Sequence, residues 1–168
     1  MLVSSKDQGR TWQYLSTIAD DPGGKLGRFH EPGLVRLRSG NLVAAMRNNS
    51  GYVWIARSSD SGKTWTKAEP SPMTGHPADL VELSDGRLLC TYGLREPYHS
   101  TPGGVRATLS HDGGVTWKIE EEVILRDDFV NWDIGYPESR QLADGRILTV
   151  YYFNEQGRYS LGGTLWRP

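Results

Sequence analysis

An eight-residue pattern, Ser-x-Asp-x-Gly-x-Thr-Trp, occurs three times in this chain of 168 residues. We call the segments 5–12, 58–65 and 110–117 the three boxes; their aspartates, Asp7, Asp60 and Asp112, are 53 and 52 residues apart. Self-similarity at a fixed period is typical of repeat architectures, in which one structural unit stacks on the next. The spacing therefore predicts an array of units of about 50 residues each.

A second repeated pattern lies between the boxes, at residues 32–42, 77–88 and 137–148. Each copy indicates a strand, a tight turn and a second strand, because its Ser-Gly or Asp-Gly pair is typical of hairpins. A third strand is expected to lead into each box, and a fourth to begin at the tryptophan of the box. The unit is thus predicted to be a four-stranded antiparallel meander. No ten-residue stretch has a helical period, so we expect almost no helix.

The boxes themselves have a structural interpretation as turns. Ser and Asp side chains accept hydrogen bonds from nearby backbone N–H groups, and glycine tolerates a positive φ. The tryptophan is expected to be buried between neighbouring sheets. The three box aspartates are therefore predicted to hold turns, and none is a candidate for catalysis.

Composition excludes several classes of function. A net charge of −1 argues against a nucleic-acid-binding surface, which needs a basic excess. No run of 18 apolar residues predicts a membrane-spanning helix. No signal peptide is visible, and an extracytoplasmic location stays open if the true N-terminus lies upstream. Cys90 is the single cysteine and is expected to be buried. No ligand spacing predicts zinc or another metal, and we expect no cofactor.

The boxes resemble the Asp-box (BNR) repeats of the sialidase superfamily. This resemblance implies an all-β, six-bladed β-propeller, of which the chain covers about three blades of the C-terminal half. The expected boundaries are a blade end at 1–28, full blades at 29–72 and 73–125, and a three-stranded last blade at 126–168. The missing half belongs to a longer protein or is supplied by a homodimer that completes the ring; both alternatives stay open.

The resemblance also implies candidate site residues. Glu31 and Arg47 match the family's Glu-bearing blade, in which a Glu opens the innermost strand and a carboxylate-binding Arg closes the next. Tyr136 matches the nucleophilic tyrosine, although Tyr-Pro stands here where the family has Tyr-Ser. The base partner of that tyrosine is Glu31. A further substrate-binding arginine is either Arg95 or Arg106, which the sequence does not distinguish.

The same residues also have ordinary structural interpretations. Glu31 and Arg47 could be solvated charges at a hairpin end, and Tyr136 could be a packing aromatic. Asp133 lies on the same expected rim, where it orients substrate or is simply a loop residue. His76 is expected to face the channel, and the sequence assigns it no role.

The function implied is that of a sialidase-like glycoside hydrolase, which removes a terminal sialic acid or a related sugar and takes a glycan as its substrate. Two alternatives remain: a non-catalytic propeller that binds glycan or protein, and a hydrolase for a different, uncharged sugar. The family's first arginine and its acid Asp are not in this chain. The isolated monomer is therefore expected to have no measurable sialidase activity.

Overall fold

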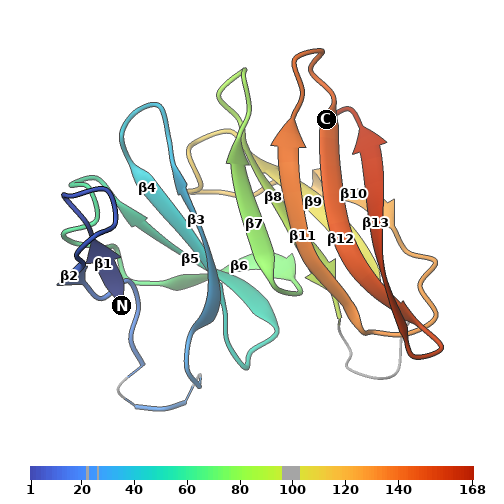
Figure 1. The fold of residues 1–168 in the computed structure, drawn as a ribbon, viewed down its shortest axis with the longest axis horizontal. Coiled ribbons are helices and arrows are strands. Elements are labelled where there is room, and N and C mark those ends of the chain that lie inside the picture. The colour runs from blue at the N-terminus through green and yellow to red at the C-terminus, as the bar shows by residue number, and fades with distance from the viewer. Residues whose placement is uncertain (22, 26, 96–102) are drawn as a thin grey trace.

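A computed structural model describes residues 1–21, 23–25, 27–95 and 103–168 (Figure 1). Within these residues the fold is all-β, with thirteen strands and one 3₁₀ turn at Ile119–Glu121. The strands form four antiparallel sheets. The described part of the chain contains no helix long and apolar enough to span a membrane.

The four sheets follow one another along the chain, and strands that are neighbours in sequence pair with each other. The first sheet has two strands, β1 (Leu2–Ser4) and β2 (Gln13–Ser16). The second contains β3 (His30–Arg36), β4 (Leu42–Arg47), β5 (Tyr52–Ser58) and β6 (Glu69–Thr74). The third contains β7 (Ala78–Glu82), β8 (Leu88–Leu94), β9 (Gly104–Ser110) and β10 (Val123–Arg126). The fourth contains β11 (Ile134–Gln141), β12 (Ile147–Glu155) and β13 (Arg158–Trp166).

The meander predicted from the repeats is the observed unit, with one correction. In each of the last three sheets the first two strands are joined by a short turn with a positive-φ glycine, Gly40, Gly86 or Gly145. After the first box, β2 begins at Gln13, directly after Trp12, as expected, but the fourth strands of the second and third sheets begin later. β6 begins four residues after Trp65, and the 3₁₀ turn separates Trp117 from β10. The chain therefore crosses from one strand to the next through the box and a further short connection.

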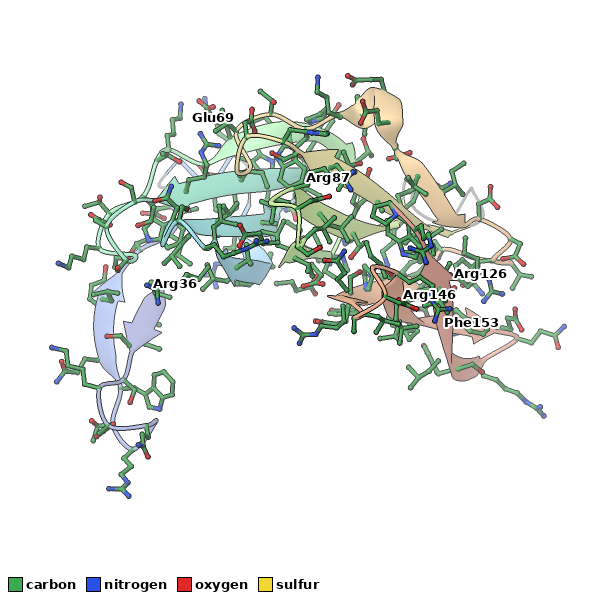
Figure 2. The ribbon with its side chains drawn as sticks, turned by 90° about the horizontal axis from the view of Figure 1, so that it is seen from above. Arg36, Glu69, Arg87, Arg126, Arg146 and Phe153 are labelled. Carbon is green, nitrogen blue, oxygen red and sulfur yellow. The ribbon has the colours of Figure 1, made fainter. Side chains whose placement is uncertain are left out.

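The sheets stack face to face and bury apolar side chains between them. The largest core cluster lies between the second and third sheets, where Val43 and Ile55 meet Leu80 and Tyr92. Smaller clusters join the first sheet to the second and the third to the fourth. Viewed from above, the sheets follow an arc with the first sheet at one end (Figure 2). Each unit thus covers a face that its neighbour cannot bury alone.

The first strands of the last three sheets, β3, β7 and β11, lie side by side and form the inner edge of the stack. Gly33 allows β3 to approach β7 closely, since a Cβ atom at this position would lie 2.5 Å from the carbonyl oxygen of Ala78. This contact leaves no room for a side chain. It brings the openings of neighbouring inner strands together.

The three boxes share one hydrogen-bond pattern. In the second box, Ser58 Oγ donates to Asp60 Oδ1 over 2.8 Å and accepts from Gly62 N over 2.9 Å. The Thr64 hydroxyl donates to Asp60 Oδ2 over 2.6 Å. Hydrogen bonds from the hydroxyl and the backbone N–H of Thr64, followed by the bond from Ser58, lower the pKa of Asp60 to about 2. The pKa values of Asp7 and Asp112 are also about 2. The box aspartates therefore hold turns.

The box tryptophans are not all buried, which corrects the expectation for Trp12. Trp117 is 7% exposed in the core between the second and third sheets, and Trp65 packs against the cluster of the first two sheets. Trp12 is 62% exposed. It belongs to the first sheet in the stack, where the described chain supplies no preceding sheet to cover the indole ring.

Candidate active site

Near the start of each inner strand lies a residue followed by proline: Glu31 before Pro32, His76 before Pro77 and Tyr136 before Pro137. The His76–Pro77 peptide bond is cis. Glu31 and Tyr136 have positive φ angles of 47° and 48°. Residues before proline favour extended backbone, and a positive φ is strained for any residue with a side chain. Strain of this kind is concentrated at functional sites.

The pairing of the strands is interrupted at the same two places. The register between β3 and β4 shifts between His30 and Gly33, and that between β11 and β12 shifts between Gly135 and Glu138. Such bulges turn side chains away from the regular alternation of a strand. The irregular backbone thus directs Glu31 and Tyr136 out of their own sheets.

The two side chains meet. The Tyr136 hydroxyl donates a hydrogen bond of 2.5 Å to Glu31 Oε1, although the residues are 105 positions apart. The hydrogen bond to Glu31 raises the pKa of the Tyr136 phenol, as do partial burial and the carboxylate charge, while Arg95 and Arg47 act in the opposite direction. Tyr136 is 50% exposed, so its ring remains accessible.

Arg47 stands at the end of β4 and contacts two of these inner-strand residues. Its Nη1 lies 3.3 Å from Glu31 Oε2 and 3.2 Å from His76 Nδ1. His76 is 2% exposed. Burial, then the charges of Arg47 and Arg95, lower the pKa of His76 to about 4, against the opposing effect of Glu31. The imidazole is therefore neutral at physiological pH.

Arg95 follows β8 and reaches the fourth sheet. Its Nε donates to the carbonyl oxygen of Ile134 over 2.5 Å, and its Nη2 donates to the Tyr152 hydroxyl and lies 3.7 Å from Asp133 Oδ1. The ring of Tyr152 is 5.9 Å from that of Tyr136. Arg95 is 8% exposed, so most of its guanidinium is enclosed by these partners. The rest of the loop predicted to carry it, residues 96–98, lies outside the described residues.

Asp133 is the centre of a polar network that the sequence did not predict. Its carboxylate accepts hydrogen bonds of 2.8 Å from Tyr152, 2.9 Å from Asn154 and 2.8 Å from Tyr159. Burial opposes ionisation, but these bonds and the charge of Arg95 lower the pKa of Asp133. The carboxylate thus fixes the side chains around Arg95.

Arg106, the other candidate, is not brought to this group. It lies in β9, where its Nε is 3.8 Å from Glu122 Oε2 and its Nη1 donates to the carbonyl oxygen of Arg126 over 3.0 Å. The Tyr92 hydroxyl donates to the same Glu122 carboxylate. Of the two arginines that the sequence left open, the structure thus brings Arg95 toward Tyr136.

A hollow of about 220 Å³ opens beside the Tyr136–Glu31 pair. Its walls include Asp79 and Glu138. Burial raises the pKa of Asp79, although the Ser139 backbone N–H donates to its carboxylate over 2.9 Å. Burial and the charge of Asp79 raise the pKa of Glu138. The hollow therefore brings several carboxyl groups close to one phenol.

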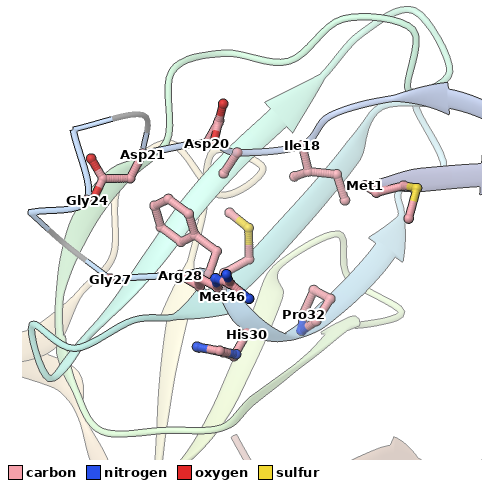
Figure 3. A pocket seen from close by; sticks show the side chains of 12 residues that line it. Met1, Ile18, Asp20, Asp21, Gly24, Gly27, Arg28, His30, Pro32 and Met46 are labelled. Carbon is pink, nitrogen blue, oxygen red and sulfur yellow. The ribbon is translucent and has the colours of Figure 1, made fainter.

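A larger hollow of about 590 Å³ lies on the other side of β3, toward the first sheet (Figure 3). Ile18, Phe29 and Met46 form much of its wall, with His30 and Pro32 at its border with β3. Its lining is mainly apolar. The smaller hollow carries the bonded phenol and carboxylate, so we take it as the candidate site, together with Arg47, which contacts Glu31, and His76, which contacts Arg47.

One feature of the sequence could have pointed to His76 as a site residue. The same position of the repeat, just before a proline, holds Glu31, His76 and Tyr136. The network of Asp133 had no comparable signal, because Asp133 lies in the irregular segment before β11 and its partners come from β12, β13 and the residue after β8. Within the described residues, no group of three or more His, Cys, Asp or Glu side chains could hold a metal ion.

Comparison with known proteins agrees with this architecture. The BNR repeat-like domain matches residues 1–150. A sialidase of Bacteroides fragilis is 28% identical over 160 residues, which cover 90% of this chain and 27% of that protein. A protein of unknown function from Dyadobacter fermentans has 33% identity and a TM-score of 0.83, over 98% of this chain and 44% of the other.

An α-L-arabinofuranosidase of Fusarium graminearum shares the fold, with a TM-score of 0.72 and 18% identity over 91% of this chain and 50% of the other. The chain thus spans about a quarter to a half of the length of these three proteins.

The stacked sheets and these matches define the class: the chain is an all-β module with the β-propeller type of fold, and its sequence is similar to that of sialidases. It belongs to the BNR repeat-like domain family of the sialidase superfamily.

Proposed function

We propose that this chain carries one half of the active site of an exo-glycosidase that releases a terminal sugar acid of the sialic acid type. The observation that carries the proposal is the 2.5 Å hydrogen bond from Tyr136 to Glu31. A phenol of pKa near 10 is a weak nucleophile at neutral pH and needs an adjacent base. A glutamate in direct contact with a half-exposed tyrosine meets this need.

In the proposed reaction, Tyr136 attacks the anomeric carbon of the terminal sugar. Its phenolic proton passes to Glu31 as the new C–O bond forms, and the bond to the leaving oxygen breaks with its electron pair. A neutral nucleophile avoids placing a carboxylate directly against an anionic sugar. By the resemblance to sialidases, the acid that protonates the leaving oxygen is an aspartate outside these 168 residues.

Arg47 would hold the carboxylate of the sugar, and the buried Arg95 would add a second positive charge near it. A guanidinium stays charged and binds a carboxylate through two parallel hydrogen bonds. Arg47 is the more accessible of the two, with 29% of its side chain exposed. Arg95 is bonded to the Tyr152 hydroxyl, and its charge acts on the phenol of Tyr136.

Binding tests the proposal without requiring turnover. We expect methyl α-N-acetylneuraminide to bind the 168-residue chain with a Kd on the order of 1 mM, measured by NMR titration. Arg47→Ala should weaken binding about tenfold or more, because it removes a charge-assisted contact. Arg146→Ala is the matched control, since this exposed arginine pairs with Asp144 in the turn at the far end of β11. Equal binding by Arg47→Ala and the wild type would overturn the proposal.

Turnover gives a second readout. The verified monomer should not hydrolyse a fluorogenic sialoside, because the proposed acid is not among its residues. In any longer form of the protein that does hydrolyse the sialoside, turnover that survives Tyr136→Phe would contradict the role of this tyrosine.

A second candidate substrate is an uncharged sugar, and the pairing of Arg95 with Asp133 favours it. This carboxylate already occupies part of the Arg95 guanidinium. The C1 carboxamide of the same sialoside distinguishes the candidates, since it keeps the shape of the sugar and lacks its charge. Tighter binding of the acid supports the sugar-acid proposal, whereas equal or tighter binding of the amide supports an uncharged substrate.

A further inference from the structure

His76 occupies the middle of the three proline-linked openings, between the strands that carry Glu31 and Tyr136. The proposed sugar chemistry gives this residue no role. Its side chain is nevertheless almost completely buried, which is uncommon for a titratable group. A buried imidazole at the centre of a polar site calls for a specific partner.

Arg47 is such a partner. The distance between Arg47 Nη1 and His76 Nδ1 is 3.2 Å. A guanidinium has only N–H donors, so Nδ1 must be the acceptor and His76 must be the tautomer with its proton on Nε2. The same Nη1 lies 3.3 Å from Glu31 Oε2, and Glu31 Oε1 accepts the Tyr136 hydroxyl.

These contacts form a continuous chain of four groups. It runs from buried His76 through Arg47 and Glu31 to the exposed phenol of Tyr136. Arg47 is long, flexible and partly exposed, so its guanidinium needs an anchor to hold one position. His76 supplies that anchor from the buried side, where the imidazole has little freedom to move.

The charges around the imidazole keep it an acceptor. Arg47 faces it from β4, Arg95 from the segment after β8 and Glu31 from β3. Among these described groups, the two guanidiniums and burial favour the neutral ring, and the Glu31 carboxylate does not reverse this. A protonated ring would lose its acceptor atom and repel Arg47.

We propose that His76 is a positioning residue: its Nδ1 holds Arg47, and through Arg47 it fixes the Glu31 carboxylate where it accepts the Tyr136 hydroxyl. This proposal rests on the proposed function only in taking Tyr136 as the nucleophile and Glu31 as its base. The positioning itself is a property of the folded chain and is testable without substrate.

The test follows the Tyr136 phenol in the full chain. With ¹³Cζ-labelled tyrosine, the Tyr136 NMR signal is assigned by its loss in Tyr136→Phe and followed through alkaline pH. In His76→Ala, Arg47 and Glu31 should lose their fixed positions, so the pKa of Tyr136 should fall toward its ordinary value of 10. His76→Asn should restore the wild-type titration, because its Oδ1 accepts a hydrogen bond where Nδ1 did.

His111→Ala is the matched control, because it removes an exposed histidine in the third box. It should leave the Tyr136 titration unchanged. An unchanged Tyr136 titration in folded His76→Ala would overturn the proposal.

Nitrogen-15 NMR of the wild-type ring gives an independent check that needs no variant. His76 should show the Nε2–H tautomer and titrate near pH 4. A proton on Nδ1 at neutral pH would overturn the proposal even if His76→Ala does not fold. If sialoside binding fails while the Tyr136 and His76 signals behave as expected, the proposed function fails and the positioning role stands.

Discussion

The two ends of the sheets use the same repeat in opposite ways. At the end with the hairpin turns, all three boxes keep the same serine, aspartate, glycine and threonine, and their hydrogen bonds match to within about a tenth of an ångström. At the other end, the position before the proline changes from Glu31 to His76 to Tyr136.

This difference shows that one end of each repeat serves the fold and the other end forms the candidate site. Each box satisfies its own turn with local bonds between residues two to four apart, so every unit needs the same residues. The inner-strand openings instead contact other units. Three identical residues there could not provide an acceptor, an anchor and a phenol, so the site requires that the repeat differ at this position.

The largest expected effect is on stability and concerns a glycine of the third box. Gly114→Ala should lower the free energy of unfolding by about 4 kcal/mol, from a strained positive φ plus overpacking. Gly114 has a φ of 85°, and its Cβ would lie 3.1 Å from Val43 Cγ1 and 3.2 Å from Leu88 Cδ2. Urea unfolding followed by tryptophan fluorescence measures the change.

Gly9→Ala is the matched variant in the first box. Its φ is 84°, but the nearest atom to the added Cβ is Trp12 Cζ2 at 3.6 Å. Only the backbone strain of about 1 kcal/mol should remain. Equal losses in the two variants would show that packing between sheets does not contribute to the cost.

The second largest expected effect is a pH dependence of stability, and it arises at the end of the sheets that carries Glu31, His76 and Tyr136. The pKa of His76 is about 4 in the folded chain and 6.5 without its environment. Between these values the unfolded state binds more protons, so stability falls as the pH drops from 6.5 to 4, by about 3 kcal/mol in total. Urea unfolding at pH 7, 6, 5 and 4 measures the slope.

His76→Asn should remove most of this slope, because asparagine does not titrate. At pH 7, where the neutral imidazole contributes fully, the stability of His76→Asn should not exceed that of the wild type. A wild-type chain with constant stability between pH 7 and 4 would contradict the buried, neutral state of His76.

The smallest effect returns to the third box. Thr116→Val removes the 2.6 Å bond from the Thr116 hydroxyl to Asp112 Oδ2 and should lower stability at pH 7 by about 1 kcal/mol. The pKa of Asp112 lies near 2 when folded, below its ordinary 3.8, so this loss should shrink as the pH falls from 4 to 2. Thr116→Ser keeps a hydroxyl and should stay close to the wild type. If Thr116→Val loses the same stability at every pH, the loss comes from packing and not from the bond to Asp112.

The repeats predicted much of this fold because each unit is a local object. The boxes and the Ser-Gly and Asp-Gly turns determine their own backbone, so the strands from 32–42, 77–88 and 137–148 form as expected. The exposure of Trp12 was missed, because burial of a box tryptophan depends on a sheet from another unit.

The site was less accessible to sequence reasoning. The resemblance to sialidases pointed to Tyr136, Glu31 and Arg47, and the structure brings them into contact; their catalytic roles remain proposals. The sequence could not tell which of Arg95 and Arg106 lies near Tyr136, because this depends on the direction in which each side chain points from the third sheet. The contact of His76 with Arg47 depends on a register between sheets that no local pattern encodes.

The bond between Tyr136 and Glu31 joins the first and last of three neighbouring inner strands across the one that separates them. Gain or loss of a single repeat between them would change the angle that separates the phenol from the carboxylate while leaving every remaining meander able to fold. Proteins built on this plan can therefore lose such a contact by a change in repeat number alone, without any substitution at either residue.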